Sequence, residues 1–286
     1  MHKHSIGKHI SIDAPSAGRQ IPTCPKRVIS QRLPLLAGIV VAVVGFGMGG
    51  NAAAQAVPAK KADAPMVFAD PAKDPTKPAV GGVKWFWPTH ARNFERRKAG
   101  NIDLVFLGDS ITQGWPGDLF GKYYGSMKAV NFGCGGDKIQ NLLMRLEGDD
   151  GELKGTSPKV IVLLIGINNM EDNTDAEIAY GVDNMLKRLG QECPKAKVLM
   201  LGILPTKGTQ NDKIKSTNAL IAKLDNGKNI RFLDMGPKFL DRDGKVTDDL
   251  LGDEVHLTPK GYEIWAKTMN PLLKQMMRED GATLKR

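Results

Sequence analysis

The sequence has few histidines, few cysteines and no long apolar run, and each shortage excludes a class of site or protein. Of five histidines, three lie in the first nine residues, and one of the three cysteines is Cys24. Two histidines and two cysteines then remain, so we expect no transition-metal site. The apolar run 35–48 is shorter than the roughly 20 residues that a membrane-spanning helix needs.

The net charge of +9 is concentrated at the N-terminal end of the chain. Residues 1–56 carry six Lys or Arg residues and one Asp, whereas the remainder holds 34 basic and 30 acidic residues, a net of +4. No basic run is interleaved with aromatic residues, which a nucleic-acid interface would need. We therefore expect no nucleic-acid partner.

Residues 1–56 are laid out like an export signal. A basic segment ends at Arg32, the apolar run 35–48 follows, and small residues end in Ala54-Gln55-Ala56. This order predicts a signal peptide cleaved near Ala56, and hence a secreted or periplasmic protein without stable membrane insertion. The basic segment is longer than is typical, so an uncleaved membrane anchor and a misassigned start are the alternatives.

A change of composition separates this leader from a globular domain. Residues 57–84 contain five prolines among Ala, Lys and Asp, which predicts a disordered linker. The domain is then expected over 85–286, since 41% hydrophobic residues suffice for a core. Its two cysteines, Cys134 and Cys193, would pair only if their Cα atoms approach, and we expect buried, unpaired thiols.

Short apolar runs alternate with helical periodicities along the domain. Five runs have the length of strands: 102–107, 129–132, 160–165, 198–201 and 230–233. Between them apolar residues recur with helical spacing over 139–146, 178–189 and 214–224, and a last helix, capped by Thr258 and Pro259, should bury Trp265, Leu272 and Met276. The pattern predicts a three-layer α/β/α sandwich with a central five-stranded parallel sheet.

Chemically useful residues follow three of the predicted strands. Ser110 comes after the first strand, a glycine-rich turn over 133–137 after the second, and Asn168 after the third. Because sites in such sheets lie beyond the carboxyl ends of the strands, these residues should meet at one edge.

The sequence allows a serine-based catalytic site. A serine hydroxyl needs a neighbouring base, usually histidine, to become a nucleophile. His90 lies in a charged segment and is expected at the surface, which leaves His256 as the candidate base. Asp253, three residues earlier, is placed to orient the imidazole. Ser110, Asp253 and His256 are therefore the predicted triad.

Such a site also needs hydrogen-bond donors for the oxyanion that forms during acyl transfer. The glycine-rich turn exposes backbone N–H groups, and Asn168 offers a side-chain amide. Either feature alone is common in ordinary turns.

Taken together, four blocks resemble the SGNH (GDSL) hydrolases, a flavodoxin-like family. The blocks are Gly108–Thr112, Asn131–Asp137, Gly166–Asn169 and Asp253–His256. The Gly-Gly-Asp and Asn-Asn forms are most like the platelet-activating-factor acetylhydrolase catalytic-subunit branch. The resemblance implies Ser110 as nucleophile and, through its N–H, as oxyanion donor, with Gly136 and Asn168 as the other donors and His256 and Asp253 as base and orienting acid.

The expected function is a cofactor-independent serine esterase that works through an acyl-enzyme. Connections between strands and helices look short, with no long lid for an acyl chain, which favours small acyl groups such as acetyl on a polar alcohol. A carbohydrate ester is the first candidate substrate, and a phospholipid or lysophospholipid is the alternative. A non-catalytic glycan-binding module is the alternative of another class. Trp115 is expected to pack in the core.

Overall fold

The computed structural model describes Phe68 and residues 73–279. In this part of the chain, five parallel strands form one sheet in the order β2-β1-β3-β4-β5. The strands are β1 (Leu104–Gly108), β2 (Ala129–Gly133), β3 (Val160–Leu164), β4 (Lys197–Leu201) and β5 (Ile230–Leu233). All five correspond to predicted runs, which confirms the five-stranded parallel sheet.

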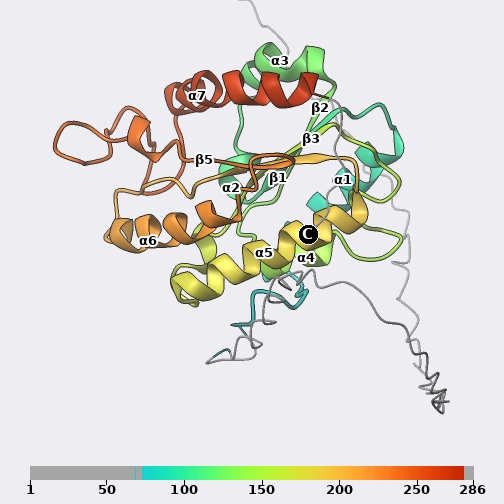
Figure 1. Ribbon diagram of the computed structural model, residues 1–286, viewed down its shortest axis with the longest axis horizontal. Helices are drawn as coiled ribbons and strands as arrows, with labels where there is room; N and C mark the ends of the chain where they lie inside the picture. Colours follow the sequence, from blue (N-terminus) through green and yellow to red (C-terminus); the bar gives the residue numbers. More distant parts are fainter. Residues whose placement is uncertain (1–67, 69–72, 280–286) are drawn as a thin grey trace, which may run out of the picture. The chain divides into compact units, whose positions relative to one another are not determined.

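Helices cover both faces of the sheet (Figure 1). They are α1 (Phe86–Lys98), α2 (Ser110–Gln113), α3 (Gly117–Tyr124), α4 (Ile139–Arg145), α5 (Asp175–Glu192), α6 (Asn211–Ile221) and α7 (Pro259–Arg278), with short 3₁₀ turns η2 (Gly125–Met127), η3 (Ile167–Asn169), η4 (Ala222–Leu224) and η5 (Gly236–Lys238). Helices α4, α5 and α6 pack on one face, and α2, α3 and α7 pack on the other. The three-layer α/β/α sandwich is thus confirmed.

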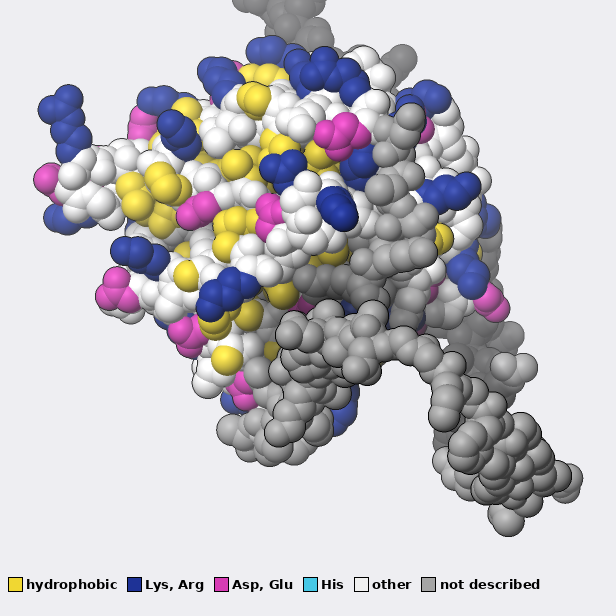
Figure 2. All heavy atoms as spheres, in the orientation of Figure 1, with side chains coloured by type: hydrophobic (Ala, Val, Ile, Leu, Met, Phe, Trp, Pro, Cys, Tyr) yellow, Lys and Arg dark blue, Asp and Glu magenta, His cyan; other side chains and the backbone are white. Residues whose placement is uncertain are grey.

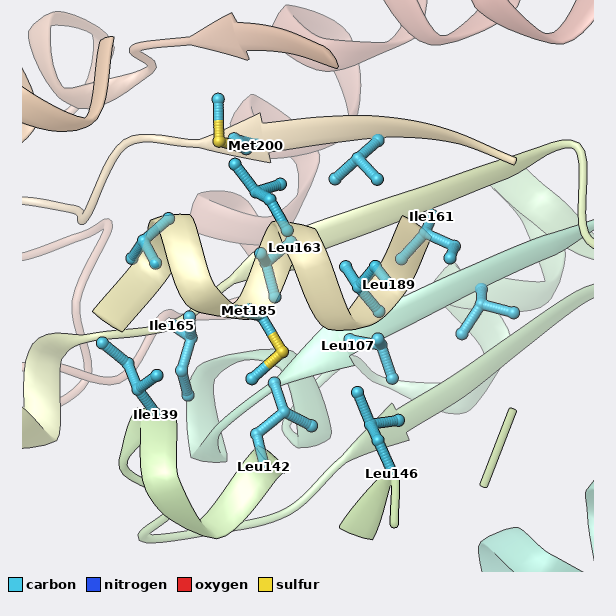
Figure 3. Close-up of a cluster of buried hydrophobic side chains, with 14 of the residues drawn as sticks. Leu107, Ile139, Leu142, Leu146, Ile161, Leu163, Ile165, Met185, Leu189 and Met200 are labelled. Atoms are coloured by element: carbon cyan, nitrogen blue, oxygen red, sulfur yellow. The ribbon is translucent and has the colours of Figure 1, made fainter. Parts of the chain in front are cut away.

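The strand residues divide between two cores because successive side chains point to opposite faces. Leu107 and Leu163 face α4 and α5 (Figure 3), whereas Phe106 and Val162 face α7. Every residue of β1, β3 and β4 is buried, as expected for central strands covered on both sides. Trp115 is buried among the aromatic rings of the second core, so its predicted packing role is confirmed.

Helix α7 begins as the sequence predicts. The Thr258 hydroxyl accepts a hydrogen bond from the Gly261 N–H at 3.2 Å, and Pro259 occupies the first helical position. The helix buries Trp265 and Met276 completely, but Leu273 is fully buried in place of the predicted Leu272, which is half-buried. Among the described residues, no helix combines the length and apolarity needed to cross a membrane.

The structure differs from the expected linker over residues 73–84, which pack against the domain. Ala79 donates its N–H to the Gln140 carbonyl and accepts from the Asn141 side chain, both at 2.9 Å. The Lys73 carbonyl accepts from the Asn173 amide at 2.9 Å. Side-chain amides of α4 and of the turn before α5 therefore hold this proline-rich backbone, and ordered contacts begin before Trp85. The predicted leader and residues 57–67 and 69–72 of the predicted linker lie outside the described residues.

Cys134 and Cys193 are both free and buried, as expected. The face of the molecule seen in Figure 2 carries basic and acidic side chains interspersed with one another. This distribution fits the near balance of charge beyond residue 56.

Candidate active site

Ser110 is the first residue of α2, directly beyond the carboxyl end of β1. Asp109 caps this helix by accepting the Ile111 N–H at 2.9 Å. Gly108 has no room for a side chain, since an added Cβ would lie 2.2 Å from the Leu164 carbonyl oxygen and from the Thr112 hydroxyl. The glycine thus allows the turn that carries Ser110 to pass close against β3.

Ser110, His256 and Asp253 are joined by hydrogen bonds. The Ser110 hydroxyl lies 2.8 Å from Nε2 of His256, 146 residues further along the chain. Nδ1 of the same ring lies 2.8 Å from a carboxylate oxygen of Asp253. Since an ionised carboxylate can only accept, Nδ1 donates to Asp253, and Nε2 of the neutral ring accepts from the hydroxyl.

Backbone hydrogen bonds hold the Asp253 carboxylate in place. It accepts the N–H groups of His256 at 2.7 Å and of Val255 at 2.9 Å. These bonds lower the pKa of Asp253 to about 2, and the bond from the His256 N–H has the largest effect. The carboxylate is therefore ionised at neutral pH and available to the imidazole.

The glycine-rich turn after β2 lies against Ser110. A Cβ placed on Gly135 would be 3.7 Å from the Ser110 Cβ and 2.9 Å from the side-chain oxygen of Gln113, which accepts the Gly135 N–H. Gly136 has a φ of +81°, a conformation that favours glycine. Within the described residues, the N–H groups of Ser110 and Gly136 have no hydrogen-bond acceptor.

Asn168 reaches the same turn from η3, beyond the carboxyl end of β3. Its amide donates to the Asp137 carbonyl at 2.8 Å, and the amide nitrogen carries a second hydrogen. Gly166, with a φ of +122°, makes the bend that leads into η3. All five residues selected from the sequence, Ser110, Gly136, Asn168, Asp253 and His256, thus follow strands or lie in a loop at one edge of the sheet.

A buried charge network that the sequence analysis missed lies beneath these turns. Arg145 is fully buried and donates to Asp137 at 2.8 Å, to Glu152, and to the Phe132 carbonyl at 3.0 Å. Burial raises the pKa of Asp137 to about 6, although Arg145 opposes the rise. The sequence did contain a signal of this network, because the basic residue Arg145 lies within the apolar periodicity over 139–146.

The prediction for His90 was wrong. Its side chain is only 14% exposed, and Nδ1 lies 2.9 Å from Glu152. The charged sequence around it suggested a surface position, but α1 turns this residue toward the buried network. His90 is thus an outer member of the same network, joined to it through Glu152.

A cavity of about 240 Å³ opens beside the hydrogen-bonded residues. Its lining is largely polar and comprises Ile167, Asn168, Glu171, Thr206, Gln210, Glu254 and Val255. Asn168 and Val255 connect it to the site. A larger cavity of about 300 Å³ lies by α6 and the end of β5, and Asn168 does not line it, whereas Asn168 does line the smaller one.

Comparison with known proteins assigns the family. Residues 106–264 match the GDSL-like Lipase/Acylhydrolase family, and the chain belongs to it. It is therefore an acylhydrolase, and the resemblance drawn from the four sequence blocks is confirmed.

Among curated relatives, the chain is similar to human platelet-activating factor acetylhydrolase IB subunit alpha2, with 33% identity over 62% of this chain and 78% of that protein. It is also similar to the human alpha1 subunit, with 30% identity over 74% of this chain and 93% of that protein. Among solved structures, a GDSL-like lipase from Bacteroides thetaiotaomicron has the same fold, with a TM-score of 0.54, 19% identity, and coverage of 66% and 97% of the two chains.

Proposed function

We propose that the protein is a serine esterase that removes small acyl groups, acetyl above all, through an acyl-enzyme. The observation that carries this proposal is the chain of two 2.8 Å hydrogen bonds from Ser110 through His256 to Asp253. In this assignment Ser110 is the nucleophile, His256 the general base and Asp253 the group that orients the imidazole.

The reaction follows from these positions. The Ser110 Oγ forms a bond to the ester carbonyl carbon while its proton passes to Nε2 of His256. The N–H groups of Ser110 and Gly136 and the Asn168 amide stabilise the negative charge on the former carbonyl oxygen. The bond to the alcohol oxygen then breaks, and His256 gives that oxygen the proton. Water, deprotonated by His256, releases the acid by the same steps.

The size and polarity of the adjoining cavity support a small, polar substrate. About 240 Å³ lined by Glu171, Thr206, Gln210 and Glu254 offers hydrogen-bonding groups and little apolar surface for a long acyl chain. We favour an acetylated carbohydrate as substrate. A phospholipid ester is the second candidate, favoured by the names of the acetylhydrolase subunits to which the chain is similar.

Hydrolysis of p-nitrophenyl esters of increasing chain length tests the acyl preference. We expect kcat/KM to be highest for acetate and to fall as the acyl chain lengthens, because the cavity beside Asn168 is small and polar. A maximum at eight or more carbons would refute the small-acyl proposal. A non-catalytic glycan-binding module would hydrolyse none of the esters.

Replacing Asn168 by alanine is expected to lower kcat by about 10² to 10³ while KM changes little, since an oxyanion donor acts mainly in the transition state. Steady-state kinetics on p-nitrophenyl acetate measure both parameters. Asn168→Asp is the matched variant, because it keeps the shape of the side chain but removes the N–H donors. An unchanged kcat in both variants would remove Asn168 from the proposed oxyanion hole.

The location of the enzyme is proposed from sequence alone. The basic segment, apolar run and Ala54-Gln55-Ala56 pattern favour export and cleavage near Ala56, giving a secreted or periplasmic enzyme. Mass spectrometry of the mature chain from the exported fraction tests this directly, since an N-terminus at Val57 is expected.

A further inference from the structure

Trp85 is an exposed tryptophan that lies beside Ser110. Its indole N–H donates to the Gly135 carbonyl at 2.8 Å. A Cβ placed on Gly135 would lie 3.1 Å from that indole nitrogen and 3.7 Å from the Ser110 Cβ, so the two side chains flank the same glycine. Trp85 nevertheless keeps 44% of its surface exposed.

Core packing does not account for this exposed ring. The next residue, Phe86, is completely buried and fills the space against Gly81, whereas Trp85 precedes helix α1 and faces the turn. Its hydrogen bond holds one edge of the indole, so the ring loses little further freedom when a ligand covers it. A large apolar surface held in place next to a reactive hydroxyl is a feature of ligand-binding sites.

We propose that Trp85 forms a wall of the alcohol subsite and stacks on the sugar ring of an acetylated glycoside. This inference rests on the proposed esterase function. A pyranose ring has an apolar face of C–H groups and a polar rim, which suits an indole that is open to water. Lys84, exposed next to Trp85, disfavours the other usual partner of a tryptophan face, a quaternary ammonium group.

Kinetics of three variants test the proposal on two acetate esters. The substrates are a mono-acetylated methyl glucoside and ethyl acetate, whose alcohol has no ring. We expect Trp85→Ala to raise KM for the glucoside by about three- to tenfold with kcat little changed, and to affect ethyl acetate less. Trp85→Phe keeps a flat ring without the N–H donor and should retain most of the glucoside affinity.

Trp87 provides the matched control. It is 53% exposed, but its ring packs against Phe86 and His90 and is not hydrogen-bonded to the Gly135 turn. We expect Trp87→Ala to leave the kinetics of both esters unchanged.

Three outcomes would overturn the stacking proposal. An unchanged KM for the glucoside in Trp85→Ala would exclude the contact. An equal loss of kcat on both esters would show that Trp85 only positions the turn. Acetylcholine serves as a third ester, and a larger KM effect of Trp85→Ala on acetylcholine than on the glucoside would assign the ring to a cation.

Failure of the esterase proposal gives a different result. In that case the wild-type protein hydrolyses none of these esters. Calorimetry then measures the binding of methyl glucoside to the Ser110→Ala variant, which tests the stacking contact of Trp85 independently of catalysis. Weaker binding in the Trp85→Ala, Ser110→Ala double variant would support the stacking contact, whereas equal binding would overturn it.

Discussion

Replacing Ser110 by alanine is expected to lower kcat/KM for p-nitrophenyl acetate by about 10⁴ to 10⁶, because no other group then forms the proposed acyl-enzyme. The proposed machinery acts as a unit, so His256→Ala and the double variant should cost about as much as Ser110→Ala alone. Steady-state kinetics and the mass of the protein after reaction with an organophosphonate measure the effect. Wild-type protein should gain one adduct at Ser110, and the alanine variant none.

Ser126 is a suitable control for this experiment. It is exposed in η2, so Ser126→Ala should retain full activity and labelling. If Ser110→Ala kept more than about 1% of the wild-type rate, a value far above the residual activity of a disabled triad, the assignment of the nucleophile would be wrong.

Replacing Arg145 by methionine is expected to lower the free energy of unfolding by about 3–5 kcal/mol, because the change leaves buried carboxylates without their cation. Arg145, Asp137 and Glu152 are all at most 1% exposed, and Arg145 contacts both acids. Urea denaturation of the two proteins measures the difference. The pKa of Asp137 should rise further in the variant, since the opposing charge is gone.

Arg188 provides the matched arginine for comparison. Its ion pair with Glu147, at 3.0 Å, is partly exposed, so Arg188→Met should cost less than about 1 kcal/mol. If Arg145→Met does not fold, the triple variant with Asp137→Asn and Glu152→Gln should recover stability, since it leaves no unpaired charge. Equal stability losses in the two single arginine variants would show that the buried network contributes no more to stability than a partly exposed ion pair.

The buried network also connects the two turns that approach Ser110. Besides Asp137, Arg145 contacts the Gly108 carbonyl at 3.4 Å, directly before Asp109. Burial raises the pKa of Asp109 to about 7. Asp109 and Asp137, whose carboxyl groups are costly to ionise, therefore adjoin Ser110 and Gly136 in the sequence. Arg145 lies between the ends of β1 and β2, which precede these residues.

Much of the fold and the candidate site could be predicted from the sequence, because local pattern decides both. Continuous apolar runs of strand length, such as 160–165, are typical of strands covered on both faces, and parallel strands bring their carboxyl ends to one edge. This geometry selected Ser110 and Asn168 as neighbours. The scarcity of histidine selected His256, since His90 was the only other candidate beyond the leader.

Only the tertiary structure decided the distances between the predicted site residues and the burial of the residues around them. The 2.8 Å contact of Ser110 with His256 joins residues 146 positions apart, and the packing of α7 and its preceding loop sets that distance. The burial of Arg145, the exposure of Trp85 beside Gly135 and the attachment of residues 73–84 likewise depend on neighbours distant in the chain. The periodicity of a segment shows which of its own faces is apolar. Burial and ion pairing depend instead on which other segment packs against that face.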